Sequence, residues 1–158
     1  MPARSAERIR RQLQTYVDRG VFRGFSEPRR ARGKHAYRFT WLTSRAFHLT
    51  YEPASRHLVF RSLLPQVPAR SDFYRDLKTF VAGRSDEKLP AHRRIDPRRA
   101  VVSCVNRGGH VSIAMRLKTG DHYAYGVTKL VNLVHEIFLM LHDRSPEYLW
   151  EQFDVSQE

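Results

Sequence analysis

The sequence has one cysteine, Cys104, and no apolar run near the ~18 residues that a membrane helix needs. A single cysteine cannot form a disulfide within the chain, and its place in the β-branched run 101–105 predicts a buried thiol. The N-terminal residues lack the apolar centre of a secretion leader. We therefore expect a soluble, cytoplasmic protein that has no membrane partner and needs no disulfide.

The sequence also lacks the compact motifs of the common catalytic and cofactor sites. It contains no GxGxxG or GxxxxGK[ST] glycine loop and no GxSxG turn for a serine nucleophile. His135-Glu136 begins like the zinc motif HExxH, but Leu139 occupies the position of the second histidine. Carboxylates are few and scattered, so no acid–base pair stands out. These absences predict a protein that is not an enzyme and has no catalytic residue, metal ligand or cofactor.

Acidic residues are outnumbered: 28 Lys+Arg stand against 16 Asp+Glu, which gives a net charge of +12. Such a charge favours an anionic partner, although a solvated basic surface without a ligand is the alternative. Most of the cations are arginines, whose planar guanidinium suits carboxylate and phosphate. The candidate anion- or partner-binding residues fall in two expected loops, the first with Arg23, Arg29, Arg30, Arg32 and Lys34 and the second with Arg93, Arg94, Arg98 and Arg99.

Apolar residues are present in clear periodic patterns. Alternation with short connections predicts an antiparallel meander over residues 37–41, 47–51 and 58–60. A hairpin is predicted over residues 101–117, because Asn106-Arg107-Gly108-Gly109 accepts the positive φ of a tight turn. Two rows of core residues are expected in the meander: Tyr37, Phe39 and Trp41, and then Phe47, Leu49 and Tyr51.

Helical periodicity predicts a first helix from an N-cap at Ser5, a second from an N-cap at Ser71, and a long third helix over residues 123–143. The apolar arc of the long helix covers about half its circumference, which predicts that it lies across a sheet. A short helix is expected over residues 146–153. The segments 23–34 and 84–99 are expected to be basic loops.

The elements therefore follow the order α-βββ-α-ββ-α, which predicts one α+β domain over residues 1–158 with its core at about 5–143. Its sheet is expected to be antiparallel and five-stranded, with the long C-terminal helix packed across it. This order resembles the type III secretion chaperone-like fold, including the YbjN-like sensory-transduction regulators, from Ser5 to Asp143. The resemblance implies a homodimer that binds extended or helical segments of other proteins. Secretion chaperones are typically acidic, whereas this chain is basic, so its protein partner is expected to be acidic.

Two other functions stay open. Residues 5–83 alone have the element order of a double-stranded RNA-binding domain, but Ser71-Asp72-Phe73-Tyr74 stands where such domains have a lysine-rich helix start. Nucleic-acid binding through the arginine loops is therefore the second hypothesis. The third is a small molecule or haem in the groove between sheet and helix.

A dimer interface is predicted from the polar side of the long helix, where Leu139 is an apolar exception. The short helix can fold back and bring Trp150 toward it. Leu139 and Trp150 are therefore expected in one apolar cluster, either within the chain or across a two-fold axis.

Overall fold

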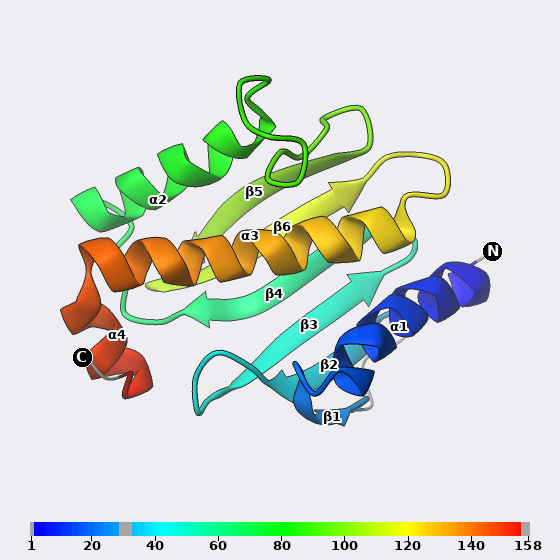
Figure 1. Cartoon of the computed structure of the whole chain (residues 1–158), viewed down its shortest axis with the longest axis horizontal. Helices are drawn as coiled ribbons and strands as arrows, with labels where there is room; N and C mark the ends of the chain where they lie inside the picture. The colour runs from blue at the N-terminus through cyan, green and yellow to red at the C-terminus, as the bar shows by residue number, and fades with distance from the viewer. Residues whose placement is uncertain (1, 29–32, 156–158) are drawn as a thin grey trace.

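Six strands form one antiparallel sheet in the computed structural model of the chain, which describes residues 2–28 and 33–155 (Figure 1). Their order across the sheet is β1-β2-β3-β4-β6-β5. Only the connection from β4 to β5 is long, because it crosses over β6 to the edge of the sheet. The strands are β1 (Arg23–Ser26), β2 (His35–Thr40), β3 (Ala46–Glu52), β4 (His57–Leu64), β5 (Ala100–Arg107) and β6 (His110–Leu117).

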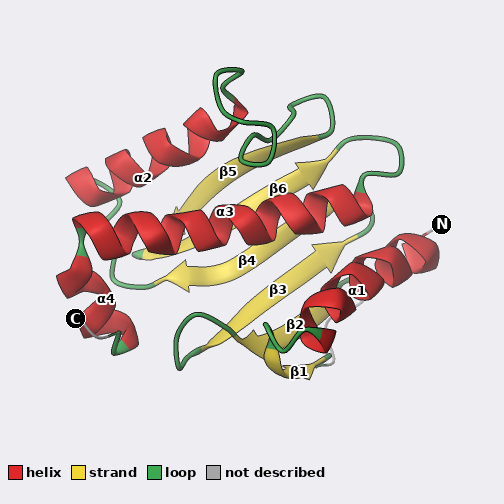
Figure 2. Cartoon of the chain, in the orientation of Figure 1, coloured by secondary structure: helices red, strands yellow, loops and turns green. Residues whose placement is uncertain are grey.

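The helices cover one face of this sheet (Figure 2). They are α1 (Pro2–Asp18), α2 (Asp72–Ala82), α3 (Tyr123–Arg144) and α4 (Pro146–Phe153), with a 3₁₀ turn at Gly83–Ser85. α3 runs across the sheet, α1 packs beside it, and α2 lies over β5. All four contribute to one buried cluster with the inward side chains of the strands.

The expected five-stranded sheet is wrong by one strand, because β1 lies in the segment predicted to be a basic loop. A four-residue edge strand needs little more than backbone pairing to β2, so its sequence carries almost no alternation. Aromatic residues in and next to β1 supply the side-chain contacts that hold it against β2. Phe22 stacks on Phe39 with centroids 3.9 Å apart, and Phe25 stacks on Tyr37 at 6.1 Å.

The predicted core rows are confirmed. Tyr37, Phe39 and Trp41 are 0–7% exposed, and so are Phe47, Leu49 and Tyr51. The hairpin turn is also confirmed, with Gly108 at φ 60° and Gly109 at φ 88°. Its position is fixed from outside the hairpin, because the Asn106 side-chain amide donates to the Val67 carbonyl at 2.8 Å.

The helix starts were predicted with mixed success. Ser71 is the N-cap of α2, and its hydroxyl accepts from the Tyr74 amide at 3.1 Å. Ser5 is not an N-cap, because α1 begins at Pro2; Ser5 lies within the helix and is buried.

The apolar stripe of α3 is buried as predicted. α3 is also the one described helix long and apolar enough to cross a membrane, but half of its most apolar window is buried in the fold, as in the core helix of a soluble protein.

Candidate anion-binding face of the sheet

No helix of the described residues lies on the second face of the sheet, and the side chains of the core cluster lie on the other face. Strand pairing aligns its side chains in rows that run across the strands. The central row consists of small residues: Ala36, Thr50, Val59, Ala114 and Ser103. The first four are only 4–9% exposed although no helix covers them. Longer side chains from the flanking rows must therefore lie over them.

Arginine and histidine side chains predominate in these flanking rows, one of which ends at Val101 of β5. On one side Arg38 pairs with His48 and His48 with Arg61, and on the other Glu52 pairs with His57 and His57 with Arg116. Arg61 covers the small row directly, because its Nε donates to the Thr50 hydroxyl at 3.2 Å. We call this surface the open face; its described strand positions hold five arginines (Arg23, Arg38, Arg61, Arg107, Arg116), three histidines (His48, His57, His110) and one carboxylate, Glu52.

The single carboxylate of the open face is already compensated. Glu52 accepts a hydrogen bond from the Ser55 hydroxyl at 3.0 Å, and Lys34 Nζ lies 3.6 Å from its other oxygen. The Ser55 hydrogen bond and then the Lys34 charge lower the pKa of Glu52 below its usual value, so the group is ionised at neutral pH. Because Lys34 balances Glu52, no further carboxylate at the described strand positions of this face neutralises the arginines.

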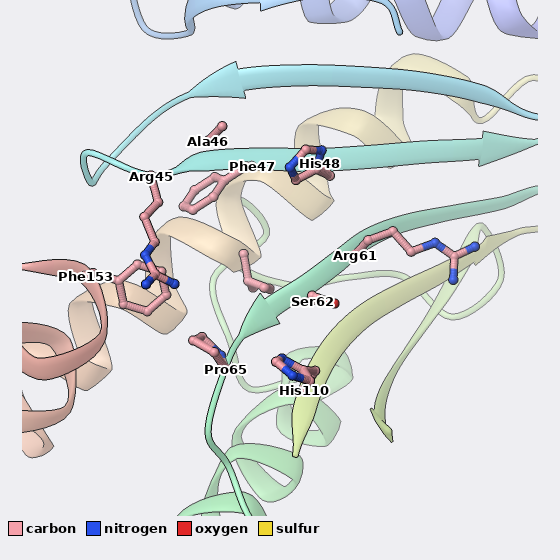
Figure 3. A pocket seen from close by; sticks show the side chains of 10 residues that line it. Arg45, Ala46, Phe47, His48, Arg61, Ser62, Pro65, His110 and Phe153 are labelled. Atoms are coloured by element: carbon pink, nitrogen blue, oxygen red, sulfur yellow. The ribbon is translucent and has the colours of Figure 1, made fainter. Parts of the chain in front are cut away.

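One end of the open face deepens into a pocket of about 210 Å³ (Figure 3). It lies where three residues of β4, 61–63, oppose the single residue Ser112 of β6, which bends β4 out of register. Ser62 takes a positive φ of 47° within this bulge. The pocket walls come from β3, β4, β6 and α4, and the lining includes Arg45, His48, Arg61 and His110 but no carboxylate.

The first predicted cluster is only partly described. Arg23 is exposed on the open face, where it pairs with Thr40 at the β1 edge. Lys34 lies beside Glu52, as described above. Arg29, Arg30 and Arg32 lie outside the described residues. The structure therefore brings two of the five predicted residues to the open face or its margin.

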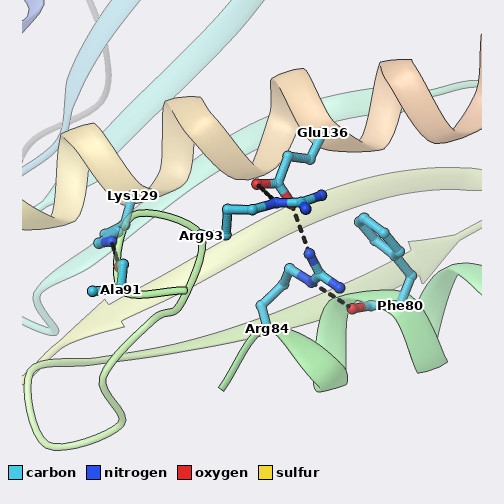
Figure 4. A network of polar contacts seen from close by, with 6 residues as sticks. All are labelled: Phe80, Arg84, Ala91, Arg93, Lys129 and Glu136. Carbon is cyan, nitrogen blue, oxygen red and sulfur yellow. Dashed lines mark hydrogen bonds and ion pairs between the residues drawn. The ribbon is translucent and has the colours of Figure 1, made fainter. Parts of the chain in front are cut away.

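In the second predicted cluster, Arg93 and Arg99 contact residues of α3 (Arg93 in Figure 4), whereas the Arg98 side chain stays exposed. Glu136 on α3 accepts from Arg84 Nη1 at 2.7 Å and from Arg93 Nε at 3.3 Å. The Arg99 guanidinium lies 3.6 Å from the centroid of the Tyr125 ring. Arg98 forms an ion pair with Asp96.

A buried anchor explains why this basic segment is ordered. Ile95 is 2% exposed and its amide donates to the Arg84 carbonyl at 2.8 Å. Arg94 follows Arg93 in the same segment and is half-buried. The segment lies against α3, in the helical layer, so it does not form one surface with Arg23 and Lys34, the described residues of the first cluster.

The predicted interface residues are both exposed. Leu139 and Trp150 are 57% and 56% exposed, and neither belongs to the buried cluster. The chain therefore leaves more than half of each side chain exposed, and their place in one apolar cluster stays a prediction. α4 does fold back onto α3, and the contact is made by Phe153, which packs on Phe138 with ring centroids 5.3 Å apart.

The open face was missed from the sequence because its residues are spread over six strands. Arg38 and Arg116 are 78 positions apart in sequence and share one face only through strand register. A signal was nevertheless present, since both arginines occupy the polar positions between core residues. Comparison with protein-family models, with curated proteins and with solved structures found no match to this chain.

Proposed function

We propose that this protein is a non-enzymatic binding module that holds an acidic, extended segment of another protein on its open face. The observation that carries the proposal is the uncompensated set of five arginines on a sheet surface without a helix. Guanidinium groups bind carboxylates through two parallel hydrogen bonds, which gives direction as well as attraction. The resemblance to the type III secretion chaperone-like fold supports the same class of function.

The chemistry of the open face favours a peptide over single-stranded nucleic acid. Proteins that bind single strands on a sheet stack the bases on aromatic side chains. The described strand positions of the open face hold no aromatic residue other than histidine, since the phenylalanines and tyrosines of the sheet face the core. Base stacking therefore has no platform here, whereas carboxylates have several guanidinium partners.

We also propose that the protein is a cytoplasmic homodimer whose subunits meet through the helical layer. A two-fold contact between open faces would place two arginine-rich surfaces against each other, which is unfavourable because like charges repel. Leu139 and Trp150, the two most exposed large apolar side chains described, lie on α3 and α4 instead. A contact there would bury them and leave both open faces available to a partner.

The proposal is tested with a labelled peptide of alternating Glu and Ser, about eight residues long, which spans the ~24 Å width of six strands. We expect micromolar binding by fluorescence anisotropy at about 0.15 M salt. The double variant Arg38→Glu/Arg116→Glu should weaken it at least tenfold, since two attractive charges become repulsive. Arg11→Glu/Arg75→Glu makes the same change of net charge in the helical layer and should leave binding within about twofold.

Two results would overturn the proposal. Equal losses in both double variants would mean that net charge, rather than the open face, attracts the peptide. A labelled RNA duplex of about 16 base pairs is measured in parallel. If the duplex binds more tightly than the peptide at the same salt, and the open-face variant abolishes this binding, nucleic acid is the partner.

A further inference from the structure

The pocket at the β4 bulge combines a cationic mouth with an apolar wall. The Arg45 guanidinium lies over the Phe153 ring, 5.6 Å from its centroid, and His110 stands on the opposite side (Figure 3). Phe47, Leu63 and Phe153 line the pocket between them, although each is only 3–4% exposed. A ligand that enters would meet apolar carbon beside the Arg45 guanidinium.

The walls of the pocket are held by contacts from both sides, so the pocket exists without a ligand. The Tyr148 hydroxyl of α4 donates to the Pro65 carbonyl at 2.6 Å, which ties α4 to the segment after β4. Burial raises the pKa of Tyr148, so this hydroxyl keeps its proton across the physiological range. On the other side the Ser62 amide donates to the Ser112 hydroxyl at 2.9 Å, which fixes the bulge.

The size of the pocket limits the ligand. A cavity of about 150 Å³ accommodates a benzene ring, and drug-sized ligands occupy about 300 Å³ or more. At about 210 Å³ this pocket lies between these sizes. It therefore suits one ring or one branched aliphatic group with a single small polar substituent.

We propose that this pocket is a binding site for a small organic monocarboxylate that carries one ring or a branched aliphatic group. The apolar part lies against Phe47, Leu63 and Phe153, and the carboxylate is bound by Arg45 with His110 at the mouth. This site goes beyond the proposed function, because it takes a free small acid rather than a protein segment. It also rests on Arg45 and Phe153, which are not part of the open face.

The test is an NMR titration of the full chain with phenylacetate. We expect saturable binding with a dissociation constant of about 1 mM, given the few atoms of the ligand. The largest shifts should fall on the amides of Ser62, Leu63 and His110. Phenylacetamide, which lacks the charge, and acetate, which lacks the ring, should each bind at least fivefold more weakly.

Two matched variants separate the pocket from the general charge. Arg45→Gln should weaken phenylacetate binding about tenfold, because the cation at the pocket mouth is lost. The fold should be kept, since the Arg45 side chain is exposed. Arg116→Gln removes the same charge at the other end of β6, ~20 Å from His110 along the strand, and should change binding less than twofold. Rescue by Arg45→Lys to within about threefold of the parent is expected, because a cation returns to the mouth.

Three results would overturn this inference: equal binding of phenylacetamide and phenylacetate, parental affinity in Arg45→Gln, or equal losses in Arg45→Gln and Arg116→Gln. The acidic peptide is measured on the same samples. If phenylacetate binds as described and the peptide does not, the proposed function fails while the pocket stands. The reverse pattern removes the pocket and leaves the proposed function in place.

Discussion

Gly126 is the point at which α3 comes closest to the sheet, and its replacement by alanine tests the packing of the whole core. A Cβ built on Gly126 would clash with Leu117 Cδ2, because the two atoms would lie much closer than the ~3.5 Å that separates carbons in contact. Leu117 Cγ and Cδ1 would lie 3.5 and 3.6 Å from the same Cβ. Leu117 is fully buried, so its side chain cannot turn aside without displacing its neighbours.

Two effects of Gly126→Ala oppose each other. Alanine favours the helix over glycine by about 1 kcal/mol. Forcing a methyl group into a filled core costs about 1–3 kcal/mol. Because Leu117 has no free space to move into, we expect the steric cost to exceed the helical gain and the variant to lose about 1 kcal/mol of unfolding free energy.

A double-mutant cycle with Leu117→Ala makes the cause visible. Leu117→Ala alone should cost about 2–5 kcal/mol, since it leaves a cavity. In that background Gly126→Ala should stabilise by about 1 kcal/mol, so the two substitutions couple by about 2 kcal/mol. Urea unfolding followed by the fluorescence of the buried Trp41 gives each value.

The control for this cycle is Gly83→Ala. Gly83 has a φ of −74° and an added Cβ would meet nothing within 4 Å. Its replacement should therefore be neutral or stabilise by up to about 1 kcal/mol. If Gly126→Ala stabilises the parent as much as it stabilises the Leu117→Ala variant, the close approach of α3 to β6 does not exist and the reasoning is refuted.

Other predictions concern the loop, the thiol and the interface. Glu136→Gln should cost about 2 kcal/mol of unfolding free energy and speed amide exchange in residues 84–99, because it removes the carboxylate shared by two guanidiniums. The control Asp72→Asn, which breaks an exposed ion pair, should cost at most about 0.5 kcal/mol. Equal costs for the two variants would contradict this prediction. Burial raises the pKa of Cys104 to about 11, so its thiolate is scarce at pH 8 and its reaction with a disulfide reagent should be about 100-fold slower than in urea; equal rates would show an accessible thiol. Sedimentation at micromolar concentration should show a dimer that Leu139→Asp shifts to monomer, and a parent that sediments as a monomer would exclude the proposed interface.

Local signals explain the parts of the fold that the sequence predicted. The aromatic rows follow the two-residue period of a strand, and Gly108-Gly109 supplies the positive φ that a tight turn demands. The Ser71 hydroxyl caps α2 within its own turn. Each of these choices depends on neighbours within a few residues, so the sequence contains the information directly.

The sequence misled where a segment depends on partners far along the chain. The segment around Arg93 and Arg99 has the composition of a solvated loop, but Glu136 and Tyr125 bind these arginines from a helix formed some 26–43 residues later. β1 is too short to show a period, and it exists because β2 offers an edge to pair with.

By itself the sequence determined the period, caps and turns of most elements, because these depend on steric and hydrogen-bonding preferences of adjacent residues. The tertiary structure alone decided the open face and its pocket. Strand register places Arg38 and Arg61 in one row of this surface and Arg116 in another row. The β4 bulge brings Ser62 to the pocket, whose other walls include Arg45 and α4. A shift of register by one residue would turn these side chains into the core. The candidate site is therefore a consequence of pairing between distant strands, which no single segment specifies.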